Sequence, residues 1–313
     1  MNRLGTAILL AAAALVAGAA NPSAPPDLVE ASGIAVRAEG KVAIVAGDET
    51  PDRLWAVALD DFSKRWDLPF PADIAGMDDV EALAPWGKDG LFIACSQSRT
   101  KPRGRTRPAR DRLALVTLGP DARTITAGRV YENLRGRLIE HLLREARDAL
   151  ENPAALSEES PKSGGLNVEG LAVWQGRLLV GLRSPAAKGG GAIVIPIRSP
   201  EKLFEPGGAE KAPDFGKPLI LPAAPGEGIR DLCATDGDVL AVLGPSGEAQ
   251  TPAPRIVRWN PTTNEIRKVH AKGWEGIAKP EGIALDPQDR LLVVQDQRPP
   301  LPQVLFRLEL SNP

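Results

Sequence analysis

Three glutamates hold the same place in a segment that recurs along this chain. They are Glu81, Glu169 and Glu281, and Ser32 and Arg230 take that place in two further copies of the segment. Carboxylates gathered around one axis repel one another and are costly to bury without a counter-charge. A divalent cation such as Ca²⁺, which binds carboxylate and carbonyl oxygens, would supply that charge. An ion-pair network centred on Arg230 would supply it as well, and the sequence leaves both alternatives open.

A second set of polar residues follows the apolar part of the copies. Arg99, Arg183 and Arg298 each stand just after an apolar run. A guanidinium offers a planar fork of donors to a carboxylate or a phosphate, so these arginines suit an anionic ligand. Together with polar residues at the ends of other copies, they give six candidate ligand-binding residues: Arg99, Arg183, Asn167, Asp48, Arg230 and Asp296.

The elements that must position these residues are pairs of short apolar strands. The five copies span residues 32–49, 80–98, 168–184, 229–246 and 280–297. One supersecondary unit repeated at tens of residues is typical of a β-propeller. In an antiparallel pair the first strand starts where the second one ends. All copies therefore bring their polar ends to one end of the ring, which we call the mouth. Glu227 and Gly228 offer a rival alignment of the fourth copy, which would move Arg230 out of the set.

The fold expected is all-β, a five-bladed β-propeller with a short α-helical insertion; a sixth, irregular blade within the long second unit is the alternative. Apolar residues at mostly three- and four-residue spacing over 133–151 predict an amphipathic helix, within an insertion at 132–152. This helix would either wall the central opening or cover blade edges. The last copy lacks an outermost strand, which is then absent or supplied by the N-terminal segment 27–36.

The N-terminus predicts export. Residues 1–20 combine Arg3, an apolar stretch and small residues, as a signal peptide does. A flexible leader at 21–28 and a single propeller domain at 29–313 follow. We expect a periplasmic or secreted monomer without a membrane span after cleavage. Cys95 and Cys233 are expected to stay unpaired, and a net charge of −2 gives no attraction to nucleic acid.

The sequence lacks the residues that several common kinds of catalytic or metal site require. The only histidines are His141, in the predicted helix, and His270, in a predicted outer strand. A Ser-His-Asp triad, a two-histidine zinc site and a Cys-His pair each need histidine beside its partner residues, and neither of these two positions provides that. The sequence also has no Gly-rich phosphate loop between a strand and a helix.

Several motifs in order resemble one protein family. The segments are DDVEALAPW (78–86), GLNVEGLAVW (165–174), EGIRDLCATDGDVLAVLG (227–244) and KPEGIALD (279–286). They resemble the DUF3616 family of uncharacterised bacterial proteins over nearly the whole mature chain. The segment 167–172, preceded by a helical insertion, is more distantly similar to phytase-like or esterase-like propellers. In that group an Asn-x-Glu-Gly-hydrophobic-Ala segment opens a blade, and calcium-dependent members gather carboxylates and basic residues around their ions.

These observations predict an exported propeller that binds a small anionic ligand at its mouth. With a divalent ion present, hydrolysis of a phosphoester or another ester would follow. Glu81, Glu169 and Glu281 would then be metal ligands or catalytic general bases, while Arg99 and Arg183 would hold the anion and stabilise developing charge. The alternative is a non-catalytic module of the cell envelope, in which the ring face and helix 133–151 dock another protein.

Overall fold

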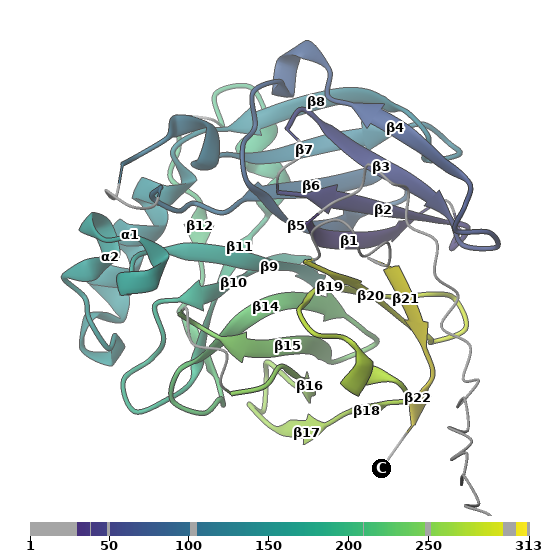
Figure 1. Cartoon of the computed structure of the whole chain (residues 1–313). Coiled ribbons are helices and arrows are strands. Elements are labelled where there is room, and N and C mark those ends of the chain that lie inside the picture. Colours follow the sequence, from purple (N-terminus) through teal and green to yellow (C-terminus); the bar gives the residue numbers. More distant parts are fainter. Residues whose placement is uncertain are drawn as a thin grey trace, which may run out of the picture.

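The chain forms a ring of five antiparallel sheets. The computed structural model describes residues 30–37, 39–48, 51–100, 105–208, 210–247, 252–296 and 305–311. The predicted signal peptide at 1–20, the leader at 21–28 and Arg298 lie outside these residues. Figure 1 shows the first strand of each sheet nearest the middle of the ring and the later strands farther out. The prediction of a five-bladed propeller is confirmed.

The first, second and fourth blades have four strands each, hydrogen-bonded in sequence order. The first comprises β1 (Ala31–Arg37), β2 (Val42–Gly47), β3 (Arg53–Ala58) and β4 (Arg65–Pro69). The second comprises β5 (Val80–Trp86), β6 (Gly90–Cys95), β7 (Leu113–Leu118) and β8 (Ile125–Tyr131). The fourth comprises β14 (Glu227–Ala234), β15 (Val239–Pro245), β16 (Arg255–Trp259) and β17 (Ile266–Lys268).

The third blade splits its outermost position between two short strands. Its strands are β9 (Asn167–Trp174), β10 (Arg177–Ser184), β11 (Ala192–Arg198), β12 (Asp214–Phe215) and β13 (Leu219–Leu221). Both β12 and β13 pair with β11. Short 3-10 helices occur at Ala72–Ile74, Pro108–Arg110, Arg147–Ala149, Pro161–Ser163, Pro200–Phe204 and Trp274–Gly276.

The hydrogen-bonded sheet of the fifth blade has three strands, β19 (Pro280–Leu285), β20 (Leu291–Gln295) and β21 (Leu305–Leu308). At its outer end the chain continues into β22 (Leu310–Ser311), which pairs separately with β18 (His270–Ala271), a strand that precedes the blade in the sequence. The prediction that the N-terminal segment supplies an outermost strand of this blade is wrong. Residues 31–37 form β1, whose almost continuous apolar run is buried as the innermost strand of the first blade.

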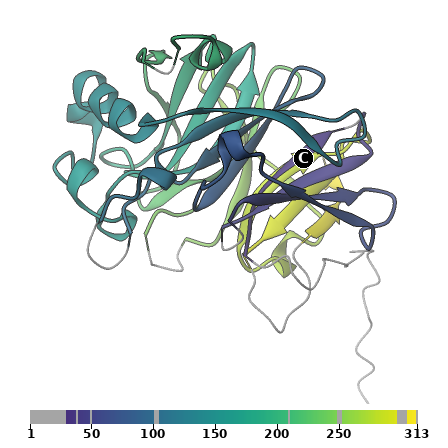
Figure 2. The ribbon, with the colours of Figure 1, turned by 90° about the horizontal axis from the view of Figure 1, so that it is seen from above.

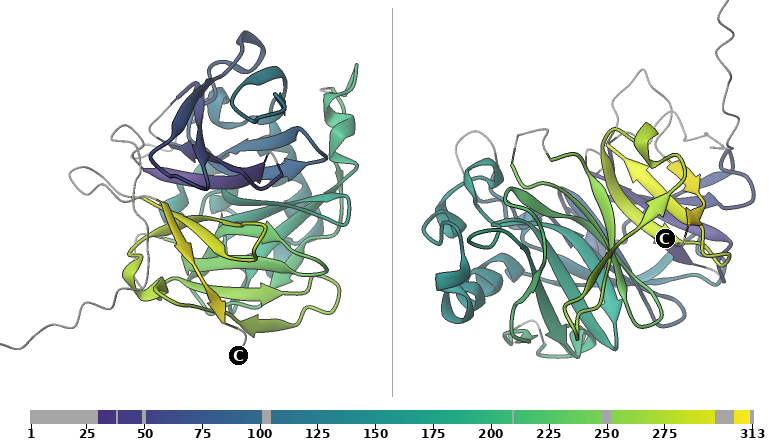
Figure 3. Two further views of the ribbon diagram at one scale, coloured as in Figure 1. Left: turned by 90° about the vertical axis from the view of Figure 1, so that its right-hand side faces the viewer. Right: turned by 90° about the horizontal axis from the view of Figure 1, so that it is seen from below.

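Apolar packing between blades closes the ring, and among the described residues no strand pairs the first blade with the fifth. Ile34 and Val45 of the first blade form one buried cluster with Leu292 and Val294 of the fifth. Figure 3 (left) shows the first blade in purple directly beside the last blade in yellow. Burial of these aliphatic side chains is the dominant favourable term that joins the two ends of the ring.

The predicted helical insertion is present but shorter than expected. Helix α1 spans Leu134–Glu145, and α2 spans Ala155–Glu158. The backbone of Ala146 leaves the helical region, and Leu150 then pairs in extended form with Ala187. Leu134, Leu138 and Leu142 are buried on the second and third blades. Figures 1 and 2 show both helices at the outer flank of the ring, so α1 covers blade edges and does not wall the central opening.

No helix among the described residues combines the length and the apolar character needed to span a membrane. Cys95 and Cys233 are both free thiols, as expected.

Candidate functional site at the mouth of the ring

Every blade carries a β-bulge at the same place in its first strand. The ladder with the second strand skips one residue in β1, β5, β9, β14 and β19. The skipped residues are Ser32, Glu81, Glu169, Arg230 and Glu281. A bulge bends the strand and re-aims the side chain of its extra residue. The position recognised in the sequence is therefore a backbone feature shared by all five blades.

The structure decides between the two alignments of the fourth copy. Arg230 is the bulge residue of β14. Glu227 lies elsewhere, buried against Arg255, whose Nε and Nη2 donate to its two carboxylate oxygens over 2.8 and 2.7 Å. Arg230 therefore belongs to the set of five.

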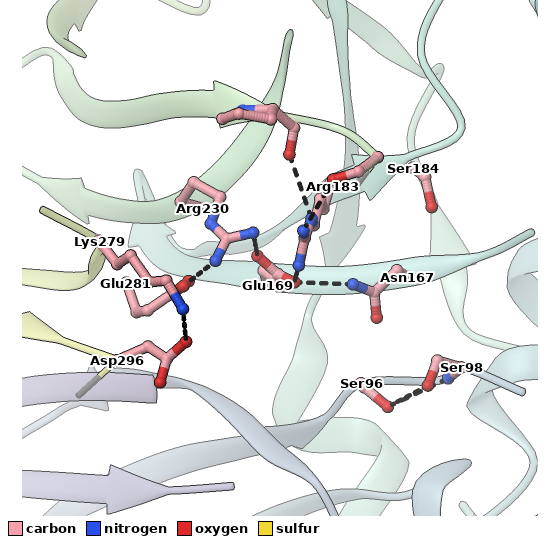
Figure 4. A network of polar contacts seen from close by, with 12 residues as sticks. Ser96, Ser98, Asn167, Glu169, Arg183, Ser184, Arg230, Lys279, Glu281 and Asp296 are labelled. Atoms are coloured by element: carbon pink, nitrogen blue, oxygen red, sulfur yellow. Dashed lines mark hydrogen bonds and ion pairs between the residues drawn. The ribbon is translucent and has the colours of Figure 1, made fainter. Parts of the chain in front are cut away.

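Arg230 joins two of the three glutamates. Its Nη1 lies 3.1 Å from Glu169 Oε2, and its Nη2 donates to Glu281 Oε1. The side chains of Glu169 and Glu281 are 4% and 11% exposed, so both charges need a partner. For Glu169 and Glu281 the counter-charge is therefore the guanidinium of Arg230, which is one of the two alternatives that the sequence left open. Figure 4 shows Arg230 between the two glutamates.

Glu169 is the centre of this network. Its Oε1 accepts hydrogen bonds from Arg183 Nη1 over 2.7 Å and from Asn167 Nδ2 over 2.8 Å. Arg183 also donates from Nε to the carbonyl oxygen of Pro245 and from Nη2 to that of Gly247, each over 3.2 Å. Arg183 and Asn167 thus lie at the mouth as predicted, where they hold Glu169 and tie the third blade to the fourth.

Glu81 belongs to a different group. One carboxylate oxygen from each of Asp48, Asp79 and Glu81 lies within 4.8 Å of the others. Burial raises the pKa of Glu81 well above its usual value, and the negative charges of Asp79, Glu169 and Asp48 raise it further. Burial also raises the pKa of Asp79, against the attraction of Arg110. The structure therefore divides the three candidate metal-binding glutamates into Glu81, among aspartates, and the pair bound by Arg230.

Two predicted residues lie at the edges of the mouth. Asp296 follows β20 and pairs with Lys279, whose Nζ is 3.1 Å away (Figure 4). Arg99 has its Nη2 3.8 Å from Glu158 Oε2 of α2, which places it toward the helical insertion. Arg298 falls outside the described residues.

Arg110 lies beside the carboxylates of the mouth, although the sequence did not single it out. Its Nη1 lies 2.8 Å from Asp79 Oδ2, and its Nε lies 2.9 Å from Asp78 Oδ2. Ser98 Oγ also contacts Asp79 Oδ2, over 3.4 Å. In the sequence, Arg110 is one of several arginines between residues 99 and 112. It ends the 3-10 helix at Pro108–Arg110, and its contacts with Asp78 and Asp79 place its guanidinium at the mouth.

Comparisons with known proteins agree with the fold. The crystal structure of Myxococcus xanthus glutaminyl cyclase matches with a TM-score of 0.52 and 13% identity, over 94% of each chain. A glucose dehydrogenase matches with a TM-score of 0.48 and 13% identity, over 91% of this chain and 97% of that one. Regucalcin, a calcium-binding protein from Agrobacterium tumefaciens, gives 0.38 and 15%, over 90% of both. The match to the glutaminyl cyclase, at 13% identity, shows the fold alone.

A search among curated proteins gave no significant match. A family model described as a protein of unknown function, DUF3616, matches residues 120–300, which is more than half of the chain. These residues include the Asn-Val-Glu-Gly segment at 167–170 and the bulges of the third, fourth and fifth blades. The chain belongs to the DUF3616 family.

Proposed function

We propose that the protein binds a divalent cation at its mouth through Asp48, Asp79 and Glu81, and a small anionic ligand through that cation. The observation that carries the proposal is the position of Glu81. Within the described part of the chain, its carboxylate makes no hydrogen bond and no ion pair, although it is half-buried between two further carboxylates. A buried carboxylate in this position needs a proton or a cation.

Other carboxylates of the mouth differ from Glu81, because each of them has a basic side chain as a partner. Asp79 has a guanidinium nitrogen at 2.8 Å, Glu169 has one at 2.7 Å, and Glu281 is bound by Arg230. Asp296 has the ammonium group of Lys279 at 3.1 Å. Glu81 therefore differs from these four carboxylates, because among the described residues no basic side chain forms an ion pair with it. This charge distribution supports cation binding there.

Oxygen ligands favour a hard cation, with Ca²⁺ as the first candidate. Ca²⁺ takes about six to eight oxygen ligands, so three carboxylates leave positions for oxygens of a ligand. An anion would meet the cation more readily than Arg183, whose donors already bind Glu169 and two carbonyl oxygens. Arg110 borders the same site and would supply the nearest guanidinium.

Hydrolysis of a phosphoester or another ester is the reaction that such a site would support. A bound divalent cation polarises a phosphoryl or carbonyl oxygen and activates water. Glu81 is the candidate general base, because Glu169 and Glu281 are held by arginine. Measuring the release of phosphate or alcohol from a panel of esters, with Ca²⁺ and with chelator, tests this step.

The same proposal includes export of the protein and a monomeric state. The signal-peptide pattern of residues 1–20 supports the export. N-terminal sequencing of the protein from cell fractions would find a new terminus near residue 21, and light scattering would give the mass of one chain. A protein that stays in the cytoplasm with residues 1–20 attached would contradict export.

The competing function, docking of an envelope protein through helix 133–151, has less support. Leu134, Leu138 and Leu142 of α1 are buried against the blades, and Ile139 and Leu143 pack partly buried against the same cluster. Among the described residues, Ile266 is the one large hydrophobic side chain with high exposure.

Thermal unfolding of the purified protein with chelator, Ca²⁺ or Mg²⁺ tests cation binding. A cation at a hundredfold excess over its Kd adds about 2.7 kcal/mol to the native state and raises the Tm. Glu81→Gln should abolish the shift, and Asp296→Asn, whose carboxylate pairs with Lys279, should retain it. An unchanged Tm with every ion would refute the proposed site.

A further inference from the structure

A cavity lies on the axis of the ring, and none of the charged residues of the mouth lines it. Its volume is about 230 Å³, and the first strands of all five blades line it. Its lining side chains are aliphatic apart from Cys233, and none of them carries a charge. This lining is unusual for the axis of a ring whose mouth is highly charged.

The cavity is closed toward the mouth. Two residues beyond each bulge residue, every first strand has a large aliphatic residue that is at most 2% exposed. These residues are Ile34, Leu83, Leu171, Leu232 and Ile283. At the same level the carboxylate of Asp231, which has no exposed surface, accepts a hydrogen bond from the backbone N–H of Ile283 over 2.8 Å. This bond ties the fourth blade to the fifth beneath the charged network.

The cavity opens on the opposite face of the ring. Two residues farther along each strand, the lining residues are partly or well exposed. These residues are Val36, Pro85, Val173, Ala234 and Leu285. A ligand would therefore enter from the face that lies away from Glu81 and Arg230.

We propose that this cavity binds the aliphatic chain of a small neutral ligand. An engineered apolar cavity of about 150 Å³ is known to stay dry and to take up molecules as large as benzene, so this volume is sufficient. A charged ligand is disfavoured, because no lining side chain would compensate its charge. The first strands are the inner edges of their sheets, and edge strands leave backbone N–H and C=O groups without a sheet partner. These groups would bind one neutral polar group, so an aliphatic alcohol is the simplest probe of this class.

A chain-length series of straight-chain 1-alkanols tests the proposal, with methyl NMR of the isoleucine-labelled protein as the readout. Chelator is present throughout, so the outcome does not depend on a cation at the mouth. The signals of Ile34 and Ile283 should shift and saturate. The affinity should rise roughly fourfold for each added methylene until the cavity is full. Ile266, exposed on the fourth blade, reports non-specific contact and should not change.

A blocking variant gives a second test. Ala234→Phe puts a ring at the open end of the cavity and should weaken alkanol binding at least tenfold. Ala127→Phe, at an exposed position of the outer strand β8, is the matched control and should bind as the wild type does. Absence of a saturable shift at Ile34 and Ile283, or wild-type binding by folded Ala234→Phe, would overturn the proposal. If Ala234→Phe does not fold, the titration of the wild type decides alone.

Discussion

Arg230 Nη1 lies 3.1 Å from Glu169 Oε2, and these two residues occupy the same bulge position in neighbouring blades. The bulge aims side chains of opposite charge at one another from equivalent backbone positions. Arg230 also binds Glu281 of the fifth blade, so one guanidinium connects three blades at the mouth.

Removing that guanidinium should be strongly destabilising. Arg230→Met leaves Glu169 and Glu281 with less compensation for their buried charge, and breaking a buried pair in this way costs about 3–5 kcal/mol. Urea denaturation measures the loss as a lower midpoint. Arg198→Met, which breaks an exposed pair with Asp214, is the control and should change the unfolding free energy by less than about 1 kcal/mol. Equal effects of both substitutions would contradict the central role of Arg230.

Glu81→Gln should affect stability and cation binding in opposite directions. Without cations the variant should be more stable than the wild type at neutral pH, because the substitution removes a buried charge that lies among carboxylates. Its affinity for Ca²⁺ should fall by at least about tenfold, since even partners of metal ligands contribute 10- to 100-fold. Calorimetric titration with Ca²⁺ and denaturation in chelator give the two quantities. A variant that is less stable in chelator would contradict this account of Glu81.

Asp231 should make stability depend on pH. Burial raises its pKa well above the usual value of an aspartate, so the native state keeps a proton that the unfolded chain has lost. The free energy of unfolding must then fall as the pH rises from the ordinary aspartate pKa toward the raised native one. Asp231→Asn should remove this contribution, so the variant gains stability relative to the wild type as the pH rises. Urea denaturation between about pH 4 and pH 8 tests this, and parallel curves would contradict it.

Closure of the ring should depend on apolar contacts between the first and last blades. Leu292→Ala removes a fully buried side chain from the cluster that includes Ile34 and Val45, and should cost about 2–5 kcal/mol. Hydrogen exchange should show faster opening of β1 and β20 than of the third blade. Ile266→Ala, at an exposed position, should leave both measurements nearly unchanged. A uniform increase in exchange over all five blades would show that closure is not a separate weak point.

The sequence was sufficient for the ring and for the place of its mouth. Alternation and burial of apolar residues act locally, so five strand pairs with polar ends could be recognised, and with them the shared position of Glu81, Glu169, Arg230 and Glu281. The β-bulge at this position could not be predicted directly. In the sequence it is visible only as a polar residue inside an otherwise apolar strand.

The tertiary structure alone decided which charges meet. Arg230 and Glu281 are 51 residues apart on neighbouring blades, so their contact depends on how these blades are stacked. Arg110 and Asp79 belong to one blade, and their contact depends on the path of the chain between β6 and β7 and on the direction of a long side chain. The same holds for β18, which pairs with β22 at the far end of its blade, and for the apolar cavity on the axis. The local pattern of apolar residues determined the blades, whereas contacts between residues distant in the sequence determined the site, because they form only when the strands are paired and neighbouring blades are stacked.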